Sequence, residues 1–313
     1  MGMLATVTLN PTVDKTYFID KLEYGEVNRV REMTSLAGGK GINVARIAAI
    51  MGQAVTATGF AGRGTGRMIQ ESLEKYRIRH DFCRIAGESR ICVAVKERDS
   101  RKVTEFLEAG PEISGRELAG IKAKVNTLSK KCRITVLAGS LPRGVRPEIY
   151  SELIGIIKKN GGVPILDSSG KALVAGIEGR PYMVKPNRAE LETLLGSKAI
   201  SEAETLRAIK DLQGRGIPLV IVSLGAEGSL VGWDNDYYRA VPPSIDPVNT
   251  VGCGDSLVAG VAMGIIGKMS REETIRYATA VSTANALTPL AAVCNPEDVK
   301  RLQPEVKVEK LTP

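Results

Sequence analysis

The chain has 313 residues, 43% hydrophobic and 25% charged, and its length suits one large domain or a domain with a small appendage. No apolar run approaches the roughly 18 to 20 residues of a membrane span, and five cysteines without a CxxC pair and one histidine argue against a disulfide framework, a zinc site and a Ser-His-Asp triad. The net charge of +8 comes from dispersed basic residues, and only 4% of the residues are aromatic, which disfavours a nucleic-acid-binding surface. An anionic small-molecule substrate explains the charge equally well, and solvated faces explain most of it without any function. The cysteines predict reduced thiols and therefore a cytoplasmic protein.

Strand-like runs alternate with helical patterns along most of the chain. Strands are expected over residues 3–9, 54–60, 91–96, 133–138, 163–166, 182–185 and 219–223. Helices are expected over residues 41–51, 65–76, 115–130, 147–160, 202–214, 255–267 and 271–287. This alternation predicts a parallel sheet covered by helices on both faces. The run LVIV at residues 219–222 is continuously apolar, as burial on both faces of such a sheet requires.

Two stretches depart from this alternation. Residues 13–35 and 89–107 alternate apolar and polar side chains without a helical period, which is typical of half-buried antiparallel strands. We therefore expect a small β-sheet that projects from the α/β core and is built from two separate excursions of the chain.

A glycine-flanked loop, NTVGCGDS at residues 249–256, runs directly into an apolar helical pattern. Such a loop directs successive backbone N–H groups at one point, and the helix dipole adds about half a positive charge there. The loop predicts an anion hole for a transferring phosphoryl group, with Asp255 in the first helical turn as an ionised but weak base. From this motif alone, a helix cap explains Asp255 equally well. A dinucleotide fingerprint fails because Leu257 stands at its third glycine position.

Residues 37–46, AGGKGINVAR, again place glycines at the start of a helix. Lys40 suggests a P-loop, but Thr34 and Gly41 stand where that motif requires glycine and Ser or Thr. The glycines would let a ligand approach the backbone, and Asn43 could bind sugar hydroxyls. Taken alone, the segment is better explained as a glycine-rich helix start packed tightly on a strand.

Two further segments follow expected strands. In KPNRAE, residues 185–190, Asn187 and Glu190 place an amide and a carboxylate on one helix face, as hydrated Mg²⁺ needs. In isolation a capping box explains this pair better. In VSLGAEGS, residues 222–229, a strand and a tight turn could wrap a nucleotide or form a simple hairpin.

Further motifs occur in a fixed order with these segments: TLNP at residues 8–11 with Asp14, NRV at 28–30, SR at 89–90 and GSLP at 139–142. Together they resemble the ribokinase-like (PfkB) sugar kinases from end to end. Within that family the chain is similar to the branch that holds tagatose-6-phosphate kinase and 1-phosphofructokinase.

The resemblance implies a three-layer α/β core with a mostly parallel sheet and a small β-sheet lid. We expect one kinase domain over residues 1–313, with the lid formed from about residues 11–36 and 88–108. The implied reaction transfers phosphate from ATP, with Mg²⁺ as cofactor, to the free primary hydroxyl of a ketohexose phosphate. The resemblance also implies a homodimer through the lids, and no nucleic-acid or membrane partner is expected.

The resemblance implies roles for individual positions. The catalytic group comprises the base Asp255 and an anion hole of Gly252, Cys253 and Gly254. The sugar phosphate would contact Asp14, Gly39, Lys40, Asn43 and Arg90, with Arg29 as a further candidate. The ATP site would include Lys185, Asn187, Ser223, Gly225 and Gly228. Asn187 and Glu190 would organise Mg²⁺ indirectly, through water.

The stretches TEFLEAGP at 104–111, GSLPRG at 139–144 and LDSSG at 166–170 favour tagatose-6-phosphate kinase. A 1-phosphofructokinase and a catalytically silent sugar-phosphate-binding regulator are the alternatives. Relatives mostly carry Ala or Ser where this chain has Cys253. A thiol in an anion hole at a helix N-terminus should have a lowered pKa, so we expect alkylation to inactivate the enzyme and Mg-ATP to protect it.

Overall fold

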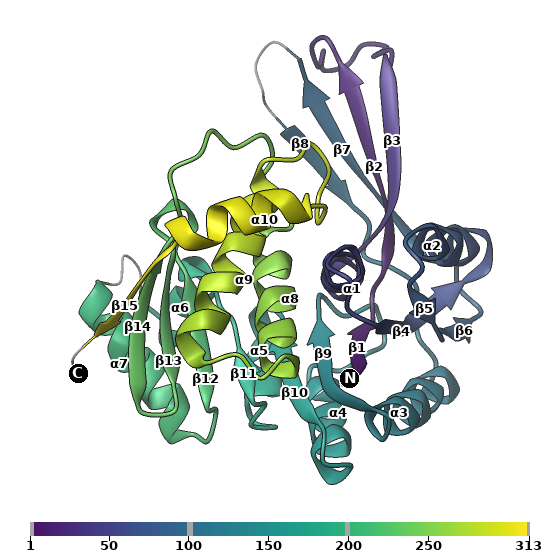
Figure 1. Ribbon diagram of the computed structural model, residues 1–313. Coiled ribbons are helices and arrows are strands. Elements are labelled where there is room, and N and C mark those ends of the chain that lie inside the picture. Colours follow the sequence, from purple (N-terminus) through teal and green to yellow (C-terminus); the bar gives the residue numbers. More distant parts are fainter. Residues whose placement is uncertain (1–2, 99–102, 198–200, 312–313) are drawn as a thin grey trace.

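The structure is a computed structural model that describes residues 3–98, 103–197 and 201–311. Its main sheet is formed by β1 (Met3–Thr8), β4 (Val55–Gly62), β5 (Arg79–His80), β6 (Cys83–Ile85), β9 (Cys132–Ala138), β10 (Val163–Asp167), β11 (Met183–Val184), β12 (Leu219–Ser223), β13 (Ser229–Trp233), β14 (Asp236–Val241) and β15 (Lys307–Leu311). The strand order is β15-β14-β13-β12-β11-β10-β9-β1-β4-β5, and β6 pairs with β4 (Figure 1). Pairing is parallel from β12 to β5 and antiparallel from β12 to β15.

Both faces of this sheet are buried, as the apolar strands predicted. In β12, Leu219 and Ile221 belong to one hydrophobic cluster and Val220 and Val222 to another. Successive side chains of a strand point to opposite faces, so each cluster is the core of one helix layer. The expected α/β fold with a mostly parallel sheet is confirmed.

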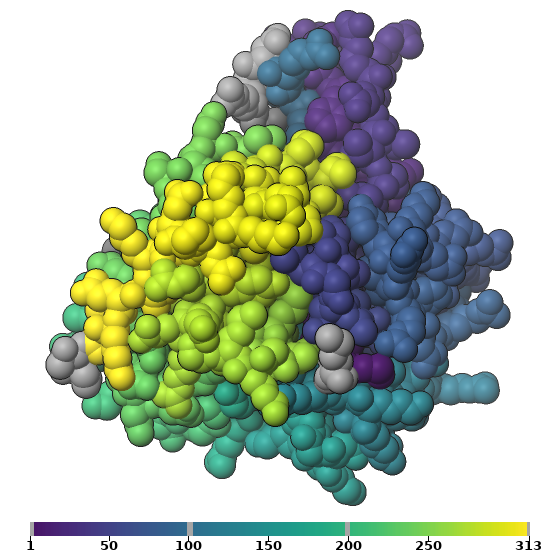
Figure 2. Space-filling view, in the orientation of Figure 1, coloured from purple at the N-terminus to yellow at the C-terminus, as the bar shows by residue number. Residues whose placement is uncertain are grey.

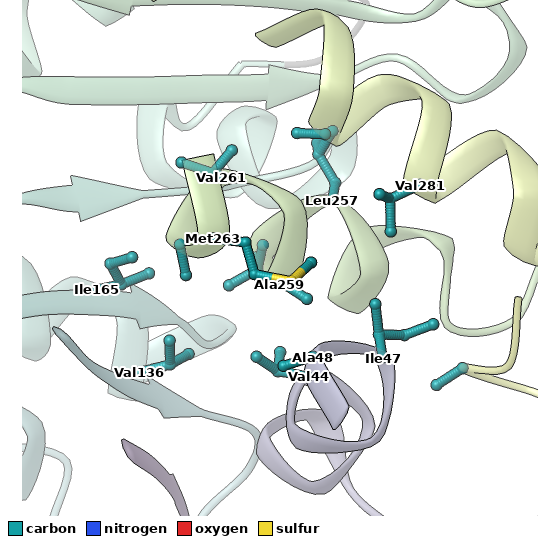
Figure 3. Packing of buried hydrophobic residues seen from close by; sticks show 14 of the residues in the cluster. Val44, Ile47, Ala48, Val136, Ile165, Leu257, Ala259, Val261, Met263 and Val281 are labelled. Carbon is teal, nitrogen blue, oxygen red and sulfur yellow. The ribbon is translucent and has the colours of Figure 1, made fainter. Parts of the chain in front are cut away.

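Two helix layers cover the sheet. The first consists of α1 (Lys40–Ile50), α2 (Arg63–Lys75), α8 (Cys253–Ile266), α9 (Arg271–Ala286) and α10 (Pro296–Leu302). The second consists of α3 (Gly115–Ser129), α4 (Ile149–Lys159), α5 (Gly170–Ile177), α6 (Arg188–Leu195) and α7 (Glu202–Gly214). In Figure 3, Val44 and Ala48 of α1 face Ala259 of α8, with Val136 of the sheet to one side. None of the helices described here is long and apolar enough to cross a membrane.

The two predicted excursions form one separate four-stranded sheet, which we call the lid sheet. Its strands are β2 (Thr12–Ile19), β3 (Glu32–Gly38), β7 (Arg90–Glu97) and β8 (Val103–Leu107), in the order β3-β2-β7-β8. It stands out from the rest of the molecule (Figures 1 and 2).

The expectation that all lid strands pair antiparallel is wrong for the central pair. β2 pairs antiparallel with β3 and β7 with β8, but β2 and β7 run parallel. Each excursion is a hairpin, and the first strands of the two hairpins lie side by side. Because both leave the core in the same direction, they cannot be antiparallel.

Most predicted element ends agree with the structure to about two residues, the usual uncertainty of such boundaries. The elements that the periodicity did not predict are short: α5, α10, the two- and three-residue strands β5 and β6, and the antiparallel strands β14 and β15. A segment of seven or eight residues shows too few helical turns for a clear period. The start of α6 and the hairpin of β12 and β13 follow the sequence motifs.

Candidate active site

A cleft of about 810 Å³ lies where the lid sheet meets the starts of α1 and α8. The predicted site residues that line it are Asp14, Gly39, Lys40, Asn43, Arg90, Lys185, Asn187, Ser223, Gly252, Gly254 and Asp255. A second cavity of about 640 Å³ is lined by Gly225, Gly228 and Cys253. Both cavities are bordered by Asn187, Ser223 and Gly254, so the two spaces adjoin at the start of α8.

Two helices begin at the cleft without a side-chain cap. α1 follows Gly39 at φ 101° and α8 follows Gly252 at φ 86°. At Gly252 a Cβ would lie 2.6 Å from the backbone nitrogen of Ala292, so only glycine fits this turn. Uncapped first-turn N–H groups carry partial positive charge and need an acceptor. The structure therefore offers anion-binding groups at two points of one cleft.

The glycine-rich start of α1 also packs tightly on β1, as the simpler interpretation predicted. A Cβ on Gly41 would lie 2.5 Å from Oγ1 of Thr8 and 3.0 Å from the carbonyl oxygen of Val7. The glycines of residues 37–46 thus serve close packing, while Lys40 and Asn43 of the same segment face the cleft.

Asp255 is a buried carboxylate at the first turn of α8, and its Oδ2 accepts a hydrogen bond of 2.8 Å from Nδ2 of Asn43. Burial, followed by the nearby Asp167, raises the pKa of Asp255 to about 6, although Lys40 acts in the opposite direction. The expectation of a weak base was therefore wrong in direction. The helix dipole favours the charged form, but desolvation opposes it more strongly. At neutral pH the carboxylate is still mostly ionised and can accept a proton.

Asp167 belongs to the site although the motifs did not identify it. It is the last residue of β10, fully buried, and its Oδ1 accepts a 3.0 Å hydrogen bond from Nζ of Lys40 and lies 3.7 Å from Nζ of Lys185. Burial alone would lower the pKa of Lys40, but Asp167, Asp255 and Glu190 raise it above its ordinary value. Its position at the carboxyl end of an expected strand could have identified Asp167 from the sequence, because ligands of open α/β sheets bind beyond these strand ends.

Asn187 and Glu190 form the capping box that the simpler interpretation predicted. Asn187 Oδ1 accepts from the backbone of Glu190 at 2.8 Å, and Glu190 Oε2 accepts from the backbone of Asn187 at 2.9 Å. The other carboxylate oxygen, Oε1, lies 3.9 Å from Nζ of Lys40. The cap therefore also holds one carboxylate oxygen towards the cleft.

Arg90 lies at the foot of the lid sheet, where backbone carbonyls hold its guanidinium. Nε and Nη2 donate to the carbonyl of Asn10 at 3.2 and 3.0 Å, and Nη1 donates to that of Glu108 at 3.0 Å. Asp14 lines the same cleft, and burial raises its pKa although Arg46 and Arg90 lower it. Arg29 differs from these residues: it is exposed, between β2 and β3, and lines neither cavity. The structure does not bring Arg29 to the cleft of its own chain.

Cys253 faces the second cavity, and its environment corrects the expected reactivity. Burial raises the pKa of this thiol, and the carboxylate of Asp255 adds to that shift, although Asn285 donates to Sγ at 3.2 Å. The helix start was expected to lower the pKa, but desolvation and a neighbouring negative charge are stronger. Cys253 is therefore not an activated thiol.

The chain matches the pfkB family carbohydrate kinases over residues 7–298. The protein belongs to this family. A tagatose-6-phosphate kinase of Staphylococcus epidermidis is 36% identical, and the match covers 98% of this chain and 99% of that protein. The phosphofructokinase-2 of Escherichia coli in complex with potassium has a TM-score of 0.93 at 28% identity, over 97% of this chain and 99% of that one. Its complex with fructose-6-phosphate has a TM-score of 0.91 at 27% identity, over the same shares.

As a pfkB-family member the protein is an ATP-dependent sugar kinase, which confirms the enzyme class that the resemblance implied. The family match spans both excursions of the lid sheet and the loop before α8. The match therefore includes the cleft residues on the lid sheet and those at the start of α8.

Proposed function

We propose that the protein transfers the γ-phosphoryl group of ATP to the free primary hydroxyl of a ketohexose phosphate, with tagatose 6-phosphate as the substrate. The observation that carries this proposal is the meeting of two cavities at Gly254, beside the buried carboxylate of Asp255. A sugar phosphate in the cleft under the lid sheet and ATP in the second cavity would meet at the start of α8.

In this reaction Asp255 accepts the proton of the attacking hydroxyl. The N–H groups of residues 252–254 bind the transferring phosphoryl group, and each such donor supplies about 3 kcal/mol of transition-state stabilisation. The side chain of Lys185 lies against Gly254, where an added Cβ would be 3.2 Å from Nζ. Lys185 and Lys40 therefore bring positive charge to the point where negative charge develops.

Mg²⁺ fits this site as a hydrated ion on the nucleotide phosphates. Among the described residues no group of three or more His, Cys, Asp or Glu side chains could hold a metal directly. Glu190 has one carboxylate oxygen towards Lys40, and the buried Oδ2 of Asp167 has no hydrogen-bond partner. Asn187 and Glu190 would hold water molecules of the ion, which would neutralise the phosphate charge.

The choice of acceptor rests on charge and on the relatives. Lys40 and Arg90 are cations of the cleft, and they favour a substrate that already carries a phosphate. The 36% identical relative favours tagatose 6-phosphate. Fructose 1-phosphate is the alternative, and fructose 6-phosphate is included because it is bound in a related structure. A silent regulator is disfavoured because Asp255, Gly252, Gly254 and Arg90 all line the cleft.

The test is an ADP-release assay with Mg-ATP that compares kcat/KM for tagatose 6-phosphate, fructose 1-phosphate and fructose 6-phosphate. We expect the highest value for tagatose 6-phosphate. A preference for fructose 1-phosphate would make the protein a 1-phosphofructokinase. No turnover with any of the three would overturn the proposed acceptor class.

We further propose that two copies pair through their lid sheets and that the enzyme acts in the cytoplasm. The pairing is supported by exposed apolar side chains on the lid sheet: Met33 (51% exposed), Phe106 (57%) and Leu107 (67%). The compartment is supported by the cysteines, all of which are free thiols.

A further inference from the structure

Arg46, on α1, is a fully buried cation that the mechanism above does not use. Its side chain is only 1% exposed. Nη1 donates to Oδ1 of Asn43 and to the carbonyl of Ala291, both at 3.2 Å, and Nη2 donates to the carbonyl of Ala37. The guanidinium lies 5.4 Å from the ring centre of Tyr76, and Nε has no partner. Its hydrogen-bond partners are all neutral.

A buried cation of this kind is not by itself evidence of added stability. A buried charge loses its hydration, and replacing it with an apolar side chain of similar volume is often neutral or stabilising. Neutral acceptors and an aromatic ring offset part of this loss. The presence of a buried arginine at this position is therefore better explained by the groups that its hydrogen bonds hold in place.

The hydrogen bond from Arg46 to Oδ1 of Asn43 determines which end of the Asn43 amide faces Asp255. An Asn side chain has an accepting oxygen and a donating nitrogen, whereas an arginine only donates. With Arg46 at Oδ1, the NH₂ group must point away from Arg46, and it donates to Oδ2 of Asp255 at 2.8 Å. Asn43 and Arg46 are three residues apart on α1, so they share one helix face.

The same guanidinium connects the walls of the cleft. Ala37 lies at the end of β3, in the foot of the lid sheet, and Ala291 precedes Ala292, which packs against Gly252. One rigid guanidinium group of Arg46 therefore contacts two neighbours of Asp255: the amide of Asn43 and the loop behind the anion hole.

We propose that Arg46 is a positioning residue for phosphoryl transfer: it orients the Asn43 amide, which in turn holds the carboxylate of Asp255. This inference rests on the proposed role of Asp255 as the base. Without Arg46 the amide oxygen loses its donor, so the side chain of Asn43 is free to move and its NH₂ group no longer holds the carboxylate in one position. The loss falls on the step in which Asp255 accepts the proton, so it lowers kcat more than it raises KM.

A double-mutant cycle separates this role from a structural one. The kcat of wild type, Arg46→Met, Asn43→Ala and the double variant is measured with ATP and the preferred sugar phosphate. We expect Arg46→Met to lower kcat by about 10- to 100-fold, the scale of a small misplacement of a catalytic group. In the Asn43→Ala background the same change should lower kcat by less than about threefold, because the group it orients is gone.

Arg46→Lys keeps the buried charge and one donor, so it should recover part of the kcat lost in Arg46→Met. It also serves as the test variant if Arg46→Met does not fold, with the same cycle against Asn43→Ala. Equal losses of kcat in the two backgrounds, or an unchanged kcat in Arg46→Met, would overturn the proposal.

A second readout does not depend on the substrate. In a protein labelled with ¹⁵N-asparagine, the side-chain amide signal of Asn43 is assigned by its loss in Asn43→Ala. Its protons should be protected from exchange in wild type and exposed to exchange in Arg46→Met. Unchanged protection would contradict the orienting role, whereas inactivity of wild type towards all three sugar phosphates would contradict only the proposed function.

Discussion

At the scale of single residues, the burial of Asp255 lowers the stability of the fold while it raises the basicity of the carboxylate. Its pKa is raised from the ordinary 3.8 to about 6 in the folded chain. Between these two pH values the folded state keeps a proton that the unfolded state has lost, so stability falls as pH rises through this window. Above pH 6 the full penalty of a buried carboxylate is present. Removing this charge should stabilise the fold.

We therefore predict that Asp255→Asn raises Tm at pH 8 by a few degrees, because an amide is cheaper to bury than a carboxylate and can still accept from Asn43. The same change should lower kcat by on the order of 10² to 10⁴. Calorimetry and the ADP-release assay test both effects on one preparation. Near-normal turnover would remove Asp255 from the role of base.

The raised pKa also predicts a pH profile. Protonated Asp255 cannot accept the hydroxyl proton, so kcat/KM should fall below about pH 6, with a slope near one per pH unit. The measurement is kcat/KM from pH 5 to 9 at constant ionic strength, with a coupling system in excess at each pH. A value of kcat/KM that stays constant down to pH 5 would contradict both the base assignment and the direction of the shift.

At the scale of elements, the start of α8 provides a matched pair of glycines. Gly252 has φ 86° and would place a Cβ 2.6 Å from a backbone nitrogen. Gly254 lies within the helix, and its Cβ would meet only the flexible end of Lys185, at 3.2 Å. We predict that Gly252→Ala lowers both Tm and kcat, because the turn is strained by about 1 kcal/mol or more.

Gly254→Ala should fold at least as well as wild type, since alanine is the better helix former by about 1 kcal/mol. Its kcat should still fall, because the methyl group displaces Lys185 from the anion hole. Thermal unfolding and turnover of the two variants are compared side by side. Equal Tm values for the two variants would show that the left-handed backbone conformation of Gly252 does not require glycine.

At the scale of the whole molecule, the lid sheet raises the question of assembly. Phe106 is 57% exposed on an edge strand, and an apolar edge of this kind is normally covered. We predict that Phe106→Asp shifts the protein from dimer to monomer in sedimentation velocity experiments. Val174→Asp, on α5 and 48% exposed, is the matched control and should leave the mass unchanged. A wild-type monomer at micromolar concentration would contradict the pairing.

Much of this molecule was readable from the sequence by itself. The long helices, the buried strands and the two excursions follow from local periodicity, which depends only on neighbouring residues. The loops at residues 37–46, 185–190 and 249–256 identified most of the cleft, because glycines and polar groups must stand at such spacings to meet a phosphate. In two of these segments the plainer interpretation was also correct: Asn187 caps α6, and Gly41 packs on β1.

Tertiary structure decided what depends on neighbours distant in the chain. The parallel pairing of β2 and β7 required both excursions to leave the core together. Asp167 entered the site, and Arg46 reached the carbonyl of Ala291, because separate strands, helices and loops converge there. The pKa values of Asp255 and Cys253 were opposite to the local expectation. A helix dipole acts through adjacent residues and can be read from sequence, whereas desolvation is the sum of everything that surrounds a group once the chain has folded.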